Sequence, residues 1–219
     1  MQNLEYKSLI DVIIERFMEI MSIKPFKPKI DNFLKKEFLR SMSKVEEQLK
    51  PSINFVTDEK ELTILNNYVF QNLQSQADSV GNQLRQELQR GLLNKETPEQ
   101  LKQRIKDVFK DKTYLNRMKT VIRTEKMRAN NYGALSGARQ AKEAGIKLKK
   151  FLHVTEDGRT SPICRMEDKK YGDKSKAIPL EDDFVVKVDN KTYRAKSPPF
   201  HYNCRTILRF VREEGKDEN

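Results

Sequence analysis

The stretch Glu143-Ala144-Gly145-Ile146-Lys147-Leu148-Lys149-Lys150-Phe151-Leu152-His153-Val154 divides the chain into two kinds of structure. Upstream of Gly145, apolar residues recur every three or four positions, which is the period of an α-helix. From Leu148 onward, the residues favour short strands bounded by turns. The sequence therefore predicts an α+β protein, with long N-terminal helices followed by a small C-terminal β-rich module packed on a basic helix.

The helical part divides into an N-terminal helical arm or bundle over residues 1–96 and central helices over residues 97–146. In the arm, we expect a short helix over 9–23, a second that stops at Pro51, and a long third helix whose apolar stripe packs into a core. That stripe repeats with helical spacing and comprises Leu62, Leu65, Val69, Leu73, Ala77, Val80, Leu84 and Leu88. Thr97-Pro98-Glu99-Gln100 predicts a helix start, because it combines a capping box with Pro at the first helical position. The last helix is predicted over 114–144, and Gly145 suits its C-terminal cap.

The C-terminal β-rich module is predicted over residues 147–212, followed by a charged tail over 213–219. Its strands are expected at 148–154, at 184–188 and 192–195 as a hairpin, and at 206–211. A module of this size is close to the limit at which a single core suffices for stability. We therefore expect a metal, a disulfide or a packed helix to reinforce it.

Positive charge is concentrated before this module. The net charge is +11, and residues 112–150 contain eleven Lys or Arg but only two Glu. Such a stripe indicates an anionic partner, most commonly a polyphosphate backbone; the alternative is a solvated helix face. The first residues to test for DNA contact are Arg117, Lys119, Arg123, Lys126 and Arg128.

No segment has the roughly 18 apolar residues of a membrane span, and no signal pattern opens the chain. We therefore expect no membrane contact, and a protein that is made or assembled in a cytoplasm.

All histidines and cysteines fall in the last third of the chain, at His153, Cys164, His201 and Cys204. Nitrogen and sulfur donors grouped in this way favour a structural zinc site, with His153 or Asp157 as the fourth ligand. A Cys164–Cys204 disulfide or close thiol contact is one alternative, and a pair of buried, inert cysteines is another. A hydrolytic set of Asp157, His201 and Cys164 is disfavoured, because the geometry that it needs is strict.

A lone carboxylate, Glu125, falls in the middle of the apolar face of the helix predicted over 114–144. Burying it without a partner would be costly. We expect it to meet an arginine of the C-terminal module, with Arg159 and Arg205 as the first candidates; otherwise it reaches water. Asp157 is the other expected acceptor for these arginines.

Three segments, in this order, are similar to the boxes of the phage Mu F-like head morphogenesis family. They are Val121–Glu125 with Arg128–Asn131, then Asp157–Arg165, and then Pro198–Arg205. The resemblance covers about residues 97–210. Two departures stand out: the chain has no Trp where the family often has one, near Phe151, and Ser161 replaces the first Cys of the second box. Arg123 and Arg128 lie within the first box, so a structural role is the alternative to DNA contact for them.

The resemblance implies a minor capsid protein of a tailed virus that docks at the portal vertex inside the head and contacts packaged DNA during packaging or ejection. The partners it implies are the portal protein, other head proteins and double-stranded DNA of any sequence. It places the protein in the virion, and in the host cytoplasm during assembly, with no catalytic residues. The alternatives are a nucleic-acid-acting enzyme, a toxin-like domain, or a plain sequence-independent DNA-binding adaptor.

Overall fold

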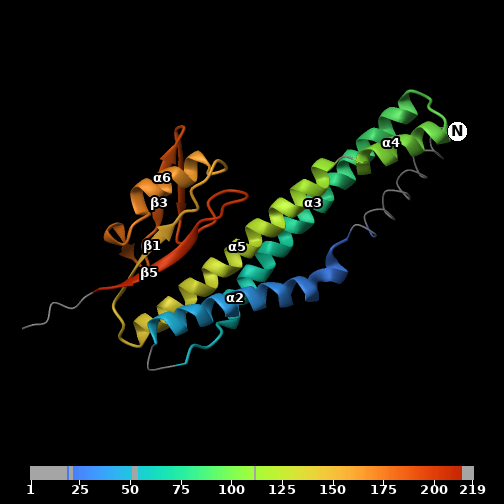
Figure 1. Ribbon diagram of the computed structural model, residues 1–219. Helices are drawn as coiled ribbons and strands as arrows, with labels where there is room; N and C mark the ends of the chain where they lie inside the picture. The colour runs from blue at the N-terminus through green and yellow to red at the C-terminus, as the bar shows by residue number, and fades with distance from the viewer. Residues whose placement is uncertain (1–18, 20–21, 51–53, 111, 214–219) are drawn as a thin grey trace, which may run out of the picture. The chain divides into compact units, whose positions relative to one another are not determined.

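The computed structural model describes residues 19, 22–50, 54–110 and 112–213, with backbone alone for 109, 110, 112–115 and 118. Most of the helix predicted over 9–23 lies outside this part of the chain. Figure 1 shows long helices followed by a small module of short strands and one short helix. The elements are η1 (Lys24–Phe26), α2 (Lys27–Leu49), α3 (Glu59–Leu93), α4 (Pro98–Lys110), α5 (Lys112–Glu143), β1 (Leu148–His153), α6 (Pro162–Tyr171), η2 (Lys174–Lys176), β2 (Ile178–Pro179), β3 (Phe184–Val188), β4 (Lys191–Ala195) and β5 (Ile207–Arg212). The α+β prediction is confirmed. No helix within the described residues is long and apolar enough to cross a membrane.

The chain forms two compact units, and the division runs through α2, α3 and α5. The first unit comprises residues 1–30 and 67–121, and the second comprises residues 31–66 and 122–219. In the first unit, Leu84 and Leu88 of α3 pack with Leu101 and Ile105 of α4. Thr97 and Gln100 form the predicted capping box, with reciprocal hydrogen bonds of 2.8 and 3.3 Å.

The apolar stripe of α3 is buried at all eight predicted positions. Its members recur every three or four residues, so they share one face of the helix. The prediction that this stripe packs into a core is confirmed.

In the second unit, α2 and α5 approach each other closely at Gly133. A Cβ atom added to Gly133 would lie 2.1 Å from the carbonyl oxygen of Phe38. No other residue fits there without moving a helix backbone, so Gly133 sets the helix spacing. Helix α5 ends as predicted, because Gly145 has a φ of 90° and the N–H of Ile146 donates to the carbonyl of Ala141.

The strands of the second unit form two small antiparallel sheets, ordered β2-β1-β5 and β3-β4. Strands β1 and β5 pair along their length, from Leu148 opposite Arg212 to His153 opposite Ile207. The β3–β4 hairpin turns at Asp189 and Asn190, which both have positive φ angles, as a two-residue turn requires. The alternation predicted for the last strand is confirmed, since Leu208 and Phe210 are buried.

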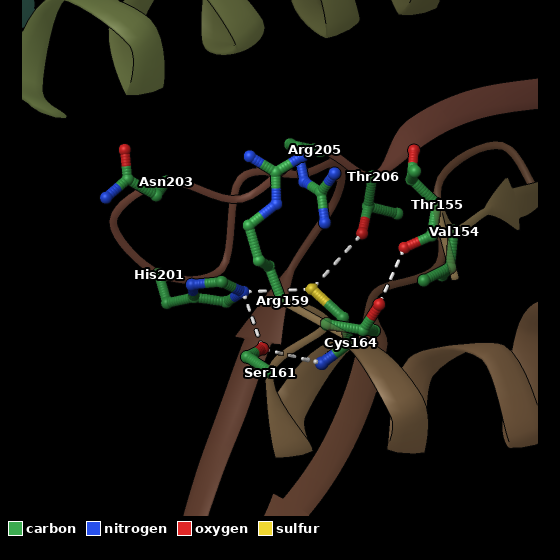
Figure 2. Close-up of a pocket in the computed structure, with 10 residues that line it drawn as sticks. Val154, Thr155, Arg159, Ser161, Cys164, His201, Asn203, Arg205 and Thr206 are labelled. Carbon is green, nitrogen blue, oxygen red and sulfur yellow. Dashed lines mark hydrogen bonds between the residues drawn. The ribbon is translucent and has the colours of Figure 1, made fainter. Parts of the chain in front are cut away.

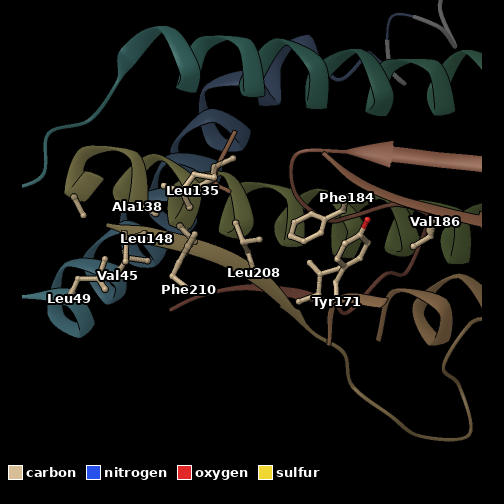
Figure 3. Packing of buried hydrophobic residues seen from close by; sticks show 14 residues of the cluster. Val45, Leu49, Leu135, Ala138, Leu148, Tyr171, Phe184, Val186, Leu208 and Phe210 are labelled. Carbon is tan, nitrogen blue, oxygen red and sulfur yellow. The ribbon is translucent and has the colours of Figure 1, made fainter. Parts of the chain in front are cut away.

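The core of this unit lies between α5 and the strands (Figure 3). Small and medium side chains of α5, including Leu135 and Ala138, meet Leu148, Phe184 and Leu208. Val45 and Leu49 of α2 belong to the same cluster. The module is therefore packed on the second half of α5, as expected.

Helix α6 was not expected from the sequence. Ser161 caps it by accepting a hydrogen bond from the N–H of Cys164 at 3.1 Å, and Pro162 occupies its first position. Both are standard signals of a helix start, but a helix of only ten residues shows little periodicity.

Candidate metal centre

Cys164, His201 and Cys204 form one cluster, in which the two sulfurs and a ring nitrogen all lie within 4.8 Å of one another. Cys164 lies in the first turn of α6, whereas His201 and Cys204 belong to the loop between β4 and β5. His153 is not part of this cluster, because it ends β1 with an exposed side chain. The structure thus brings together three of the four predicted nitrogen and sulfur donors.

The His201 ring is oriented so that Nε2 faces the sulfur of Cys164 (Figure 2). Its Nδ1 lies 2.7 Å from the carbonyl oxygen of Tyr202, which only accepts, so Nδ1 carries a proton. Nε2 then lies 2.9 Å from the sulfur of Cys164 and 2.9 Å from Oγ of Ser161. A histidine that donates through one nitrogen and presents the other is typical of a metal ligand.

The two cysteines are free thiols in different environments. Hydrogen bonds from Cys204 first, and then from His201, Ser161 and Thr206, lower the pKa of Cys164 to about 3. The same contact with Cys164, together with burial, raises the pKa of Cys204 above its ordinary value. The hydrogen bond to Cys164 also raises the pKa of His201. Neighbouring donors therefore favour the thiolate form of Cys164, and the two cysteines form the close thiol contact that was the alternative to a disulfide.

Glu167 is a member of this site that the sequence analysis missed. It is fully buried, and its Oε2 accepts a hydrogen bond from the hydroxyl of Thr206 at 3.0 Å. The same hydroxyl lies 3.6 Å from the sulfur of Cys164, and Oε1 of Glu167 has no hydrogen-bond partner among the described residues. Burial, followed by the charge of Cys164, raises the pKa of Glu167 to about 7. The available sequence signal was its spacing, three residues after Cys164 on one helix face.

Asp157 connects the turn before α6 to the loop before β5. Its carboxylate accepts two hydrogen bonds from Arg205, at 2.6 and 2.7 Å, and one from the backbone N–H of Arg159 at 2.8 Å. The Arg159 side chain lies farther away, at 3.4 Å. Asp157 is thus the carboxylate that both Arg159 and Arg205 contact. Because its oxygens are used in this way, Asp157 is not a member of the metal-ligand group.

The predicted pairing of Glu125 with Arg159 or Arg205 is wrong. Glu125 is buried as expected, but its carboxylate accepts from Arg128 at 2.8 Å, three residues along the same helix. An i,i+3 pair neutralises the buried charge within α5, so no arginine of the C-terminal module is needed.

Polar residues of α5 hold the loop that carries His201 and Cys204. The hydroxyl of Thr124 accepts from the N–H of Asn203 at 2.9 Å. The buried amide of Asn131 donates to the carbonyl of Thr206 at 3.1 Å and accepts from the N–H of Leu208 at 2.8 Å. The first of the three sequence boxes therefore positions the third.

The predicted DNA-contact residues fall into two groups. Arg117, Lys119 and Arg123 have exposed side chains. Lys126 lies 3.5 Å from Glu37, and Arg128 pairs with Glu125. Among the described residues, no acidic partner is seen for the side chains of the first group.

The chain was compared with known protein families, curated proteins and solved structures. A family model described as Phage Mu protein F like protein matches residues 78–209, which include α5 and the whole metal-ligand cluster. No curated protein and no solved structure matches the chain.

Proposed function

The chain belongs to the phage Mu protein F like family, and from this premise we propose that it is a minor head protein that docks at the portal vertex inside a tailed-phage head and contacts packaged DNA. Family membership indicates a virion-associated protein of head morphogenesis. One observation carries the proposal. The matched segment contains the turn with Asp157, the loop with His201 and Cys204 that Arg205 joins to it, and helix α5, which holds that loop.

Contact with DNA is supported by the exposed basic residues of α5. Arg117, Lys119 and Arg123 lie on α5 with exposed side chains. Contacts of this kind go to phosphates and need no base recognition, which suits a protein that meets any packaged sequence.

We further propose that the cluster holds a structural Zn²⁺ ion. Two sulfurs and one imidazole nitrogen are ligands that zinc prefers. The residues fit the ion, because neighbouring donors lower the pKa of Cys164 and the Nε2 atom of His201 faces the Cys164 sulfur. Zinc would link α6 to the loop before β5 and stabilise a module with a small core.

The experiment that tests portal docking is co-expression with the portal protein of the same phage, followed by affinity purification. We expect a stoichiometric complex, and the protein in purified particles but absent from portal-free shells. A protein that binds duplex DNA yet never copurifies with the portal would instead be the DNA-binding adaptor. Metal analysis of the purified chain tests the zinc proposal separately.

A further inference from the structure

We propose that the ion held by Cys164, His201 and Cys204 keeps its fourth coordination position open for an exogenous ligand, namely a water molecule or a small anion, on the side of Ser161. This inference rests on the proposed zinc site. It goes further by stating that the protein fills three of the four coordination positions of the ion. Four protein ligands are usual in structural zinc sites, whereas sites with three keep an open position.

Within the described part of the chain, no fourth His, Cys, Asp or Glu joins the group of ligand atoms. Among the described residues, the group of ligand atoms within 4.8 Å of one another has three members. Both oxygens of Asp157 bind Arg205. Glu167 lies outside the group and accepts from Thr206, and His153 is exposed at the end of β1.

Ser161 occupies the corner where a fourth ligand would be expected. Its Oγ lies 2.9 Å from Nε2 of His201, as close as the sulfur of Cys164 does. The same oxygen accepts from the N–H of Cys164 to cap α6, so one lone pair is already used. A neutral hydroxyl is also a weaker zinc ligand than a thiolate, imidazole or carboxylate. Ser161 is therefore placed to hydrogen-bond to a bound ligand rather than to bind the ion.

The space at this corner suits a small ligand. A cavity of about 10 Å³ borders the cluster, which is close to the room that one water molecule needs. Its lining includes Ser161, Cys164, His201, Arg159, Asn203 and Arg205. Two guanidinium groups, partly offset by the single carboxylate of Asp157, favour a negatively charged occupant. Two thiolates and one Zn²⁺ sum to zero charge, so an anion would meet no net repulsion from the centre.

The test uses the full chain with Co²⁺ in place of zinc, because the visible absorption of Co²⁺ reports its coordination and the number of thiolate ligands. We expect a two-thiolate spectrum whose visible bands shift in a saturable way when azide is added. In Ser161→Cys, a third thiolate should close the site, strengthen the sulfur-to-cobalt absorption, tighten binding by roughly tenfold or more, and abolish the azide response. His153→Ala is the matched control and should behave as wild type.

Further variants decide between the possible fourth ligands. Ser161→Ala should still bind Co²⁺ and respond to azide; loss of metal with the fold retained, checked by circular dichroism, would make Ser161 a ligand and overturn the proposal. Wild type that binds Co²⁺ but ignores azide would also overturn it, and an azide response gained in Glu167→Gln would then identify Glu167 as the fourth ligand. Wild type that binds no Co²⁺ would end the zinc proposal itself. Portal docking is measured independently of all these outcomes.

Discussion

Asp157 and Arg205 are joined by two hydrogen bonds of 2.6 and 2.7 Å, although 48 residues separate them in the sequence. This bidentate pair holds the turn before α6 against the loop before β5, which are the segments next to Cys164 and Cys204. Such pairs are geometrically specific as well as strong.

Asp157→Asn should therefore lower stability at neutral pH. The Arg205 guanidinium and the N–H of Arg159 hold the pKa of Asp157 well below its usual range. A carboxylate with a depressed folded-state pKa stabilises the protein above the unfolded-state pKa of about 4, and this stabilisation is lost as pH falls below that value. Urea unfolding should show a wild-type advantage at pH 7 that shrinks between pH 5 and pH 2. Glu156→Gln, at the neighbouring exposed position, is the control; an equal effect there would argue against a specific role for the pair.

Asn131 links α5 to the start of β5 through two buried hydrogen bonds. Asn131→Ala leaves the carbonyl of Thr206 and the N–H of Leu208 without these partners, so we expect a loss of about 1–3 kcal/mol in the free energy of unfolding. Cobalt affinity should fall as well, because the displaced loop carries Cys204. Asn130→Ala, at the adjacent half-buried position, should change both much less. Unchanged cobalt affinity in a destabilised Asn131→Ala would show that α5 does not position the metal ligands.

The spacing of nearby residues in the sequence was sufficient to predict most of the fold but only part of the site. The α3 stripe, the Thr97 capping box and the hairpin at Asp189 and Asn190 depend on residues near one another in sequence, so their spacing predicted them. Helix α6 was missed because it is short. Thr124 and Asn131 were missed because their partners are backbone groups about 75 or more residues away, which no side-chain pattern encodes. For Glu125, the prediction invoked a distant arginine although Arg128, three residues away, met the same electrostatic need.

Gly133 permits the close approach of α2 and α5, so Gly133→Ala should destabilise the second unit. The new Cβ would meet the backbone of Phe38, which cannot move without shifting a helix, and we expect a cost of about 1–3 kcal/mol. Gly137→Ala should cost less, since its Cβ would meet the side chains of Met42 and Phe55 at 3.1 Å. Gly158→Ala, with nothing within 4 Å, is the control. Equal melting temperatures for the three variants would contradict this ranking.

Lys150 is a fully buried cation on the central strand β1, so it is not available to DNA as part of the basic stripe. Its Nζ donates to the carbonyl of Lys196 at 2.8 Å and lies 5.0 Å from the centre of the Phe184 ring. Burial first, and then the charge of Lys196, lower the pKa of Lys150 to about 8. Between pH 8 and the unfolded-state pKa of 10.5, the unfolded chain binds more protons than the folded one. Stability attributable to this group therefore rises with pH across that window.

Lys150→Met should remove this pH dependence. At pH 7 we expect the variant to be at least as stable as wild type, because removal of a buried charge offsets the missing hydrogen bond. The wild type should then gain roughly 1–3 kcal/mol relative to the variant between pH 7.5 and pH 10.5. Lys147→Met, at an exposed position nearby, is the control for general loss of charge. A large loss of stability at pH 7, with no change in the pH profile, would contradict the prediction.

The exposed cations of α5 lead to a prediction about DNA affinity. Replacing Arg117 and Lys119 by Gln should weaken binding to duplex DNA of any sequence. The slope of log affinity against log salt concentration should fall in magnitude by about 0.9 for each phosphate that the variant no longer neutralises. Lys126→Gln is the matched comparison, because its ammonium group already lies near Glu37 and should contribute less. Fluorescence anisotropy over a range of salt concentrations, with two duplexes of unrelated sequence, provides the measurement. An unchanged salt slope in the Arg117, Lys119 variant would show that this part of α5 is a solvated face, and that any DNA binding in the head uses other residues.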